Sequence, residues 1–309
     1  MFGKSLFKFN RGLPTALTGL LVFSVSALFA DELRREVIRE FPLSDRGQVE
    51  IENSIGKISV KTWDSSKVKV RVVKILDVSK FKDLEEAPDA GFLDRVEIRT
   101  ESDSNTVRLQ TIIPEMKITA SNSGIFSGLK MLLGLFKGDC QRLPLSVEYE
   151  LSVPERCNLR ANCEIGEMMI QGVDGCLDLS SDIGCIETRN TSGVQHTRLS
   201  LGKITVSGVK GSVDAKSDMG QVEADFDSLG ADDRVYLESG MGAVNLVLPS
   251  GSGIDLEAES DLGSVDAKLS DSFKGRSEWN SLRGKYNKGG ASVTLKTGMG
   301  GIEIGSKPE

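Results

Sequence analysis

The sequence is poor in the residues from which most catalytic and metal sites are built. Its one histidine, His196, lies at an outward position of a repeat, and one imidazole cannot form a metal site of the usual kind. Nothing in the sequence places a serine and an aspartate beside it for a Ser-His-Asp triad. The five cysteines contain no Cys-x-x-Cys spacing, so no zinc site is predicted. We therefore predict no catalytic residue, no metal and no cofactor.

Aromatic residues and positive charge are also scarce. Aromatic side chains make up 6% of the chain while glycine contributes 33 residues, which is typical of many turns between short stacked strands. The net charge of −7 argues against nucleic acid and against an anionic membrane as general partners. With 39% apolar and 27% charged residues, the composition is that of a folded globular chain.

The first 30 residues are expected to be a secretory signal peptide. Three basic residues precede a mostly apolar stretch at 13–29, which ends in small residues suited to cleavage. An uncleaved anchor is the alternative, but Pro14, Thr15 and Thr18 shorten the apolar stretch below the ~20 residues that a span needs. Removal of these residues, with three positive and no negative charges, would change the net charge from −7 to −10. We expect an exported protein of the periplasm or the cell surface.

A glycine recurs from residue 159 to residue 304, flanked on both sides by alternating apolar residues. The first three intervals between glycines are 18 residues each, and the next are 22, 21 and 37. Each unit offers two short strands whose apolar faces can be buried only by stacking on neighbouring units. The pattern predicts an all-β parallel β-helix or β-roll-like solenoid of about 18–22-residue coils, with stacked antiparallel meanders as the alternative. The glycines expected at the structural turns are Gly56, Gly166, Gly184, Gly202, Gly220, Gly242, Gly263 and Gly300.

One unit departs from the pattern before Gly202. Gln195 and Thr197 occupy positions that are apolar in the other units. Either the register slips there, so that Val194 and Leu199 face inward, or two polar side chains are buried and need hydrogen-bond partners.

The repeats are predicted to form a solenoid domain at 155–309, preceded by an N-terminal β segment at 31–154. That segment contains an early copy of the repeat around Gly56 and several stretches of alternating apolar residues, which predict strands. Two insertions interrupt it. The insertion at 81–94 is polar and is expected to be a loop or a short helix, whereas the one at 121–139 carries apolar residues at helical spacing.

Several stretches resemble the bacterial β-strand-repeat "putative adhesin" family. The stretches are Val-Glu-Tyr-Glu-Leu-Ser-Val-Pro at 147–154, Gly-Lys-Ile-Ser-Val-Lys-Thr-Trp-Asp at 56–64, Ser-Asp-Ile-Gly-Cys-Ile-Glu at 181–187, Ser-Asp-Met-Gly-Gln-Val-Glu at 217–223 and Thr-Gly-Met-Gly-Gly-Ile-Glu at 297–303. The resemblance covers about residues 47–75 and 145–305 and leaves out the insertion at 121–139. It implies a cell-envelope protein of β-repeat fold, and it brings no catalytic residues with it.

Cys157 and Cys176 form a candidate disulfide. They precede Gly166 and Gly184 by nine and eight residues, so they would nearly superpose on adjacent coils. The spacing of ~4.8 Å between neighbouring strands lies inside the Cα range that a disulfide tolerates. Buried free thiols are the alternative.

Two segments that break the repeat are candidate interaction sites. In 121–139, the apolar residues Phe126, Leu129, Leu133 and Phe136 could contact a membrane surface or a partner's groove, or could fold back as a lid. In 271–289, basic residues accompany aromatic ones, with Trp279, Arg283 and Tyr286 as candidates. This second segment could contact an anionic glycan or a partner, or could cap the open end of the solenoid.

The outward faces of the repeats carry a mildly acidic stripe, in which Asp214 and Glu223 are a conceivable acid/base pair. A solvated sheet face that resists edge-to-edge association explains the same charges. The sequence therefore favours an exported, non-enzymatic β-solenoid that acts as an adhesin-like interaction or structural module of the bacterial envelope, with an envelope protein or glycan as partner. The alternative is a carbohydrate-active β-helix protein that binds or cleaves polysaccharide through an outward face.

Overall fold

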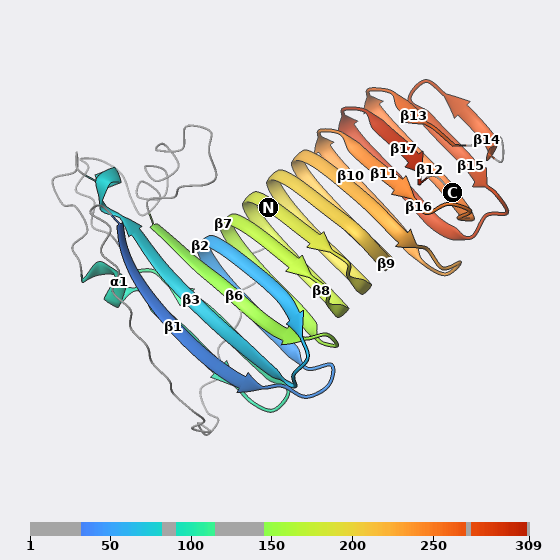
Figure 1. The fold of residues 1–309 in the computed structure, drawn as a ribbon. Helices are drawn as coiled ribbons and strands as arrows, with labels where there is room; N and C mark the ends of the chain where they lie inside the picture. The colour runs from blue at the N-terminus through green and yellow to red at the C-terminus, as the bar shows by residue number, and fades with distance from the viewer. Residues whose placement is uncertain (1–31, 82–90, 115–144, 270–272, 308–309) are drawn as a thin grey trace.

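The computed structural model describes residues 32–81, 91–114, 145–269 and 273–307, which form an all-β structure (Figure 1). Seventeen strands in these ranges belong to one large, mostly unclosed sheet. The strands are β1 (Glu32–Pro42), β2 (Gln48–Trp63), β3 (Lys67–Asp77), β4 (Glu97–Ser102), β5 (Thr106–Ile112), β6 (Leu145–Pro154), β7 (Asn158–Gln171), β8 (Asp174–Arg189), β9 (Ser192–Ser228), β10 (Arg234–Met241), β11 (Val244–Leu248), β12 (Ile254–Leu262), β13 (Val265–Ala267), β14 (Phe273–Glu278), β15 (Ser281–Tyr286), β16 (Ala291–Met299) and β17 (Ile302–Ser306).

Helical structure in the described ranges is limited to the short turns η1 (Val78–Phe81) and α1 (Phe92–Arg95). Both lie at the ends of the predicted insertion at 81–94, whose residues 82–90 are outside the described ranges. The predicted signal peptide and the insertion at 121–139 also lie outside them. The division of the chain near residue 154 stays a prediction.

Consecutive repeats pair in parallel, shifted by one 18-residue unit. In β7 and β8, Leu159 pairs with Leu177 and Gly166 with Gly184, and β8 continues in the same way onto β9. Parallel pairing is incompatible with antiparallel meanders in these units. The residues before each glycine form one ladder of strands and the residues after it form a second.

We call these the leading ladder and the trailing ladder. The leading ladder runs through β4, β5, β2, β7, β8, β9, β10, β16, β12, β15 and β14. The trailing ladder runs through β1, β3, β6, β2, β7, β8, β9, β11, β17 and β13.

A column of glycines lies where the two ladders meet. At Gly184 the backbone φ is 142°, and a Cβ added there would lie 1.7 Å from the carbonyl oxygen of Gly166. Only glycine combines this backbone conformation with such a close approach of two backbones. The same approach continues along the stack, in the spatial order Gly56, Gly166, Gly184, Gly202, Gly220, Gly242, Gly300 and Gly263.

The order of the strands in space departs from their order in the chain at both ends. β16, near the end of the chain, pairs in parallel with both β10 and β12, and β17 likewise lies between β11 and β13. At the other end, β2 pairs with β7 on one side and with β5 and β6 on the other. The spacing between repeats in the sequence therefore does not identify which strand pairs with which, because any strand in register can extend a ladder.

The core lies between the two ladders and is filled by their alternating apolar residues. In the irregular unit, Gln195 and Thr197 are buried whereas Val194 is exposed, so the register does not slip. The Gln195 amide nitrogen donates to the hydroxyls of Thr188 (3.0 Å) and Thr197 (3.2 Å), and its oxygen accepts from Thr191 (3.3 Å). These mutual hydrogen bonds satisfy the polar groups that the unit buries.

At the N-terminal end, antiparallel strands complete both ladders. β1 pairs with β3 and β3 with β6, while β4 and β5 form a hairpin against the leading half of β2. Lys74 of β3 is buried, and its ammonium donates to the carbonyl oxygens of Leu93 (3.1 Å) and Val96 (2.6 Å). Burial lowers the pKa of Lys74 from its ordinary value.

Candidate functional site

The C-terminal end of the leading ladder is closed by a hairpin rather than by another repeat (Figure 1). β14 and β15 pair antiparallel, and β15 pairs antiparallel with β12. Trp279 and Asn280 form the two-residue turn between them. The described part of the predicted segment, residues 273–289, thus closes this end of the leading ladder and also displays an unusual surface.

The outer face of the hairpin carries four cations in two directly opposed pairs. Lys274 lies opposite Lys285, and Arg276 lies opposite Arg283. The side chains of Arg276 and Arg283 are 83% and 77% exposed. Like charges directly opposite each other on neighbouring strands destabilise a sheet, so folding alone does not favour this arrangement.

Nearby carboxylates compensate only part of this charge. Arg276 lies 2.7 Å from Glu278, Arg283 lies 3.7 Å from Glu257, and Lys285 lies 3.2 Å from Asp255. Exposed pairs of this kind contribute about 0–1 kcal/mol each. The hairpin therefore keeps four solvated cations on a chain whose net charge is −7.

Trp279 projects from the tip of the hairpin and is 73% exposed. Its backbone carbonyl accepts from the Val265 amide (3.1 Å), and the Asn280 carbonyl accepts from the Ser260 amide (2.9 Å). The Asn280 side chain also donates to the Ser260 carbonyl (3.1 Å). The turn backbone is thus fixed to the sheet edge while the indole remains available to a partner.

The inner face of the hairpin belongs to the core. Tyr286 is 5% exposed and lies in the hydrophobic cluster, so the structure gives it a packing role instead of the predicted surface role. The Phe273 ring covers the opposed glycines Gly275 and Gly284, because a Cβ at either would lie under 3 Å from its Cζ. The sequence analysis names Arg283 and Trp279 but not Lys274 and Arg276, which share the outer face with Arg283. The two-residue turn at Trp279-Asn280 is the sequence signal that sets this register.

A cleft of about 660 Å³ lies on the outer face of the trailing ladder, over β9, β11, β17 and β13. Its lining includes the carboxylates Glu223, Asp225, Asp266 and Glu303. Glu223 pairs with Lys203 (2.7 Å). Asp214 lies in the other ladder, opposite Tyr236, so the structure does not bring the conceivable acid/base pair together.

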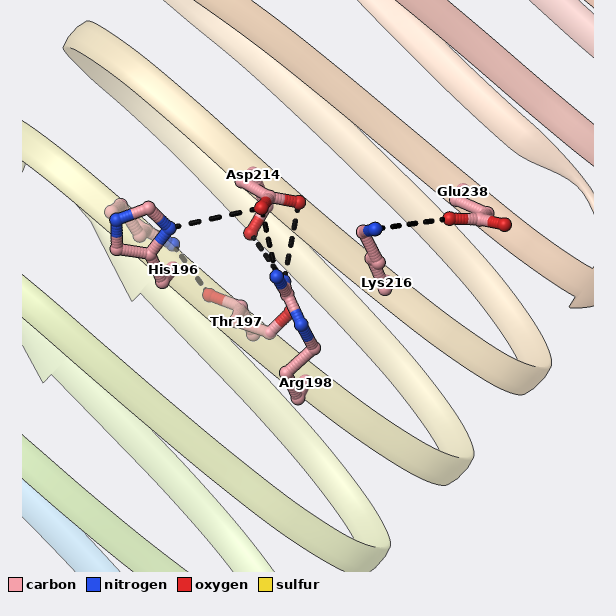
Figure 2. A network of polar contacts seen from close by, with 7 residues as sticks. His196, Thr197, Arg198, Asp214, Lys216 and Glu238 are labelled. Carbon is pink, nitrogen blue, oxygen red and sulfur yellow. Dashed lines mark hydrogen bonds and ion pairs between the residues drawn. The ribbon is translucent and has the colours of Figure 1, made fainter. Parts of the chain in front are cut away.

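Figure 2 shows what surrounds Asp214 instead. Two Arg198 nitrogens contact its carboxylate, at 2.8 and 3.2 Å, and His196 Nδ1 lies 3.8 Å away. Lys216 on the same face lies 3.4 Å from Glu238 of β10. His196 is exposed, as expected. These are cross-strand pairs between neighbouring turns of the ladder, and they stabilise its outer surface.

Cys157 and Cys176 are both free thiols in the structure, the first buried and the second exposed. Cys157 lies against Gly175, and the Cys176 amide donates to the Asn158 side chain (3.0 Å). The cysteines are therefore offset by one residue, and side chains one residue apart on neighbouring strands point to opposite faces. Burial raises the pKa of Cys157 to about 12. A disulfide between them stays a prediction.

Two absences concern only the residues that the structure describes. No helix there is long and apolar enough to cross a membrane. No group of three or more His, Cys, Asp or Glu side chains there is arranged to hold a metal ion. The predicted contact residues Phe126, Leu129, Leu133 and Phe136 lie outside these ranges.

No family model matches the chain, and no curated protein is similar to it in sequence. Among solved structures, it is similar to a putative cell adhesion protein from Clostridium sporogenes, with 16% identity over 89% of this chain and 100% of that chain and a TM-score of 0.37. A putative adhesin from Bacteroides fragilis shows 11% identity over 87% and 97%, with a TM-score of 0.32. A putative adhesin from Parabacteroides merdae shows 8% identity over 88% and 96%, with a TM-score of 0.23. TM-scores this low carry no inference about this chain.

Proposed function

We propose that this chain is an exported, non-enzymatic β-solenoid that acts as an adhesin-like interaction module of the bacterial envelope and holds an acidic glycan at its C-terminal hairpin. The observation that carries the proposal is the opposed cation pairs of β14 and β15 beside the exposed Trp279. Opposed like charges destabilise the sheet in which they lie, and departures of this kind from favourable local structure are expected where the charges bind a ligand.

The solenoid part of the proposal is supported by register and by the glycine column. Each 18-residue shift brings Gly166 onto Gly184 and Gly184 onto Gly202. Repeats that contact only their neighbours form a stiff, elongated scaffold, and its terminal unit must differ from the rest. A scaffold of this kind holds a terminal binding surface away from its own base.

The chemistry of the hairpin fits a carboxylated sugar chain. The guanidinium groups of Arg276 and Arg283 can each bind a carboxylate with two hydrogen bonds, and Lys285 adds a point charge. An exposed indole supplies a rigid apolar face at low entropic cost. Sugar chains of repeated acidic units match a row of cations that spans two strands.

Export is supported by residues 1–30 alone and is tested by cell fractionation. Recovery of a chain shortened by about 30 residues from periplasm or cell surface would support it. Recovery of the uncleaved chain from the cytoplasm would remove the envelope from the proposal.

Retention on immobilised alginate or polygalacturonate, with neutral dextran as the reference matrix, tests the binding function. We expect Arg283→Ser combined with Lys285→Ser to reduce retention on the acidic matrices at least tenfold, and added salt to reduce it further. The matched control replaces Lys57, which is half-buried, and Arg189, which is exposed; both also form surface ion pairs but lie in other repeats. Equal loss in the control variant, or equal retention on dextran, would contradict a site at the hairpin.

The cleft over β9, β11, β17 and β13 supports the second candidate, a carbohydrate-active protein. Its carboxylates could hold or hydrolyse a glycan that lies along the ladder. Incubation with a panel of polysaccharides separates the two candidates. New reducing ends or unsaturated products, lost in Glu223→Gln or Glu303→Gln, would favour catalysis and end the non-enzymatic proposal.

A further inference from the structure

The leading ladder has a free strand edge at each end of the molecule. β4 pairs only with β5, and β14 pairs only with β15, among the described residues. Figure 1 shows β14 at one extremity and the N-terminal strands at the other. An unpaired edge presents a row of free N–H and C=O groups that can bind another strand.

The two ladders do not end at the same level. The leading ladder is the longer one at the C-terminal end of the molecule, and the trailing ladder is the longer one at the N-terminal end. At the C-terminal end the leading ladder extends beyond β12 by β15 and β14, whereas the trailing ladder stops at β13. At the N-terminal end the trailing ladder extends beyond β2 by β6, β3 and β1, and the leading ladder extends by only β5 and β4. End-to-end stacking would match the two ladders to within one strand, about 4.8 Å.

The strand directions allow the free edges to pair antiparallel. β14 runs in the direction of β12 and of the other repeats, because it is antiparallel to β15 and β15 is antiparallel to β12. β4 runs against them, because it is antiparallel to β5, which pairs in parallel with β2. β14 of one copy beside β4 of another therefore forms an antiparallel pair.

One register makes every opposed charge on the outer face favourable. Three registers keep outer residues opposite outer residues with an overlap of at least four strand residues. The other two place Arg276 against Arg99 or Lys274 against Arg99. In the favourable register the outer pairs are Lys274 with Asp103, Arg276 with Glu101, and Glu278 with Arg99.

The same register provides a partner for the exposed indole on the inner face. In this register Trp279, the first turn residue after β14, would lie opposite Ile98 of the next copy, a half-buried residue packed against the core. Aromatic and β-branched side chains are favourable cross-strand neighbours. The one large side chain that the hairpin leaves in solvent would thus become covered.

We propose that copies of this chain associate head to tail, with β14 of one copy pairing antiparallel with β4 of the next. The inference rests on the proposed function, since it takes the hairpin as the interacting end, and it adds a second copy as a partner. A contact between two different surfaces of the same molecule does not close on itself and propagates into a filament.

The test exchanges charges without changing net charge. One variant carries Arg276→Glu with Glu278→Arg, and the other carries Arg99→Glu with Glu101→Arg. Sedimentation velocity of the wild-type chain should show a sedimentation coefficient that rises with concentration. Each variant alone faces two like-charge pairs in the favourable register but opposite charges in one shifted register, so the register itself must be measured. Cysteines introduced by Ser277→Cys and Thr100→Cys lie opposite each other only in the favourable register, and the disulfide between them in neighbouring copies should form at least tenfold less in either variant alone than in the wild-type background.

Mixing the two variants is the decisive measurement. The exchanged β14 of the first variant complements the exchanged β4 of the second, and the remaining ends are wild type. Equimolar mixing should therefore restore association, which also shows that both variants are folded. A monomeric wild-type chain, an undiminished disulfide between positions 277 and 100 in either variant alone, or a mixture that does not restore this disulfide would overturn the proposal. The polysaccharide test uses Arg283 and Lys285 of β15, so the two proposals can fail separately.

Discussion

The glycine column makes a quantitative prediction at Gly184. Replacement by alanine would put a Cβ 1.7 Å from the Gly166 carbonyl oxygen, and real Cβ contacts are not shorter than 3.0 Å. The two backbones must separate there by at least about 1.3 Å, the difference between these distances. The backbone φ of 142° adds strain for any residue with a side chain.

The expected cost combines these effects. Unfavourable backbone conformation costs about 1–3 kcal/mol, and each ladder hydrogen bond lost costs about 1 kcal/mol more. With two such bonds broken, Gly184→Ala should destabilise the fold by about 3–5 kcal/mol, a large share of the 5–15 kcal/mol typical of folded domains. Urea unfolding followed by circular dichroism measures the shift, with the wild-type chain as reference.

Two other glycines separate the causes. Gly251 has a φ of 73° but nothing within 4 Å of an added Cβ, so Gly251→Ala should show the conformational cost alone, about 1–2 kcal/mol. Gly305 has neither feature, and Gly305→Ala should change stability by less than about 0.5 kcal/mol. If Gly184→Ala cost no more than Gly251→Ala, backbone contact along the column would not be what requires glycine.

Three further predictions concern buried polar groups and thiols. Gln195→Leu should lower stability by about 1–3 kcal/mol in thermal unfolding, because it leaves the buried threonine hydroxyls around it without their partner. The lowered pKa of Lys74 means that the unfolded chain binds more protons between that pKa and the ordinary 10.5. Stability should therefore rise with pH through that window, and Lys74→Met should remove this rise from urea midpoints taken between pH 7 and 10. Iodoacetamide at pH 8 should label Cys176 quickly and Cys157 only after unfolding; failure to label Cys176 without reductant would instead support the predicted disulfide.

The repeat could be predicted from sequence because its causes are local. An apolar residue at every second position and a glycine at a fixed place act through the pleat and through backbone contact. The same reasoning presented two outcomes for Gln195, and the structure decides between them because three nearby threonines supply hydrogen bonds. These threonines lie within seven residues of Gln195, but whether its amide reaches them depends on how the chain bends between the two ladders, which spacing alone does not give.

The surface of the hairpin illustrates what spacing cannot provide. Arg283 and Tyr286 lie three residues apart and were equally plausible contact residues, yet odd and even positions of a strand face opposite sides. The register set by the turn at Trp279 directs Arg283 to solvent and Tyr286 to the core. Lys274 joins Lys285 on the outer face only because the two strands pair, which requires the turn to be identified first.

The position of β16 and β17 leads to a last prediction. These strands are near the end of the chain, but each lies between two earlier strands, so β12 and β13 contact the rest of the ladders through them. Deleting residues 291–309 should therefore release the preceding segment 254–286 along with the deleted strands. Limited proteolysis should degrade that segment rapidly while the repeats from β7 to β9 remain protected.

Deleting only residues 308–309 is the control, and it should leave the protease pattern unchanged. β16 lies between β10 and β12 and pairs with both. We therefore expect β12 to join the leading ladder only after β16 has been made and has paired with β10. If 254–286 stayed resistant after the long deletion, β12 would have moved onto β10 in the sequential order that the glycine spacing alone suggests. Protease resistance of that segment would thus show that β12 can pair directly with β10. The order β10, β16, β12 would then form only because the final segment, 291–309, is present.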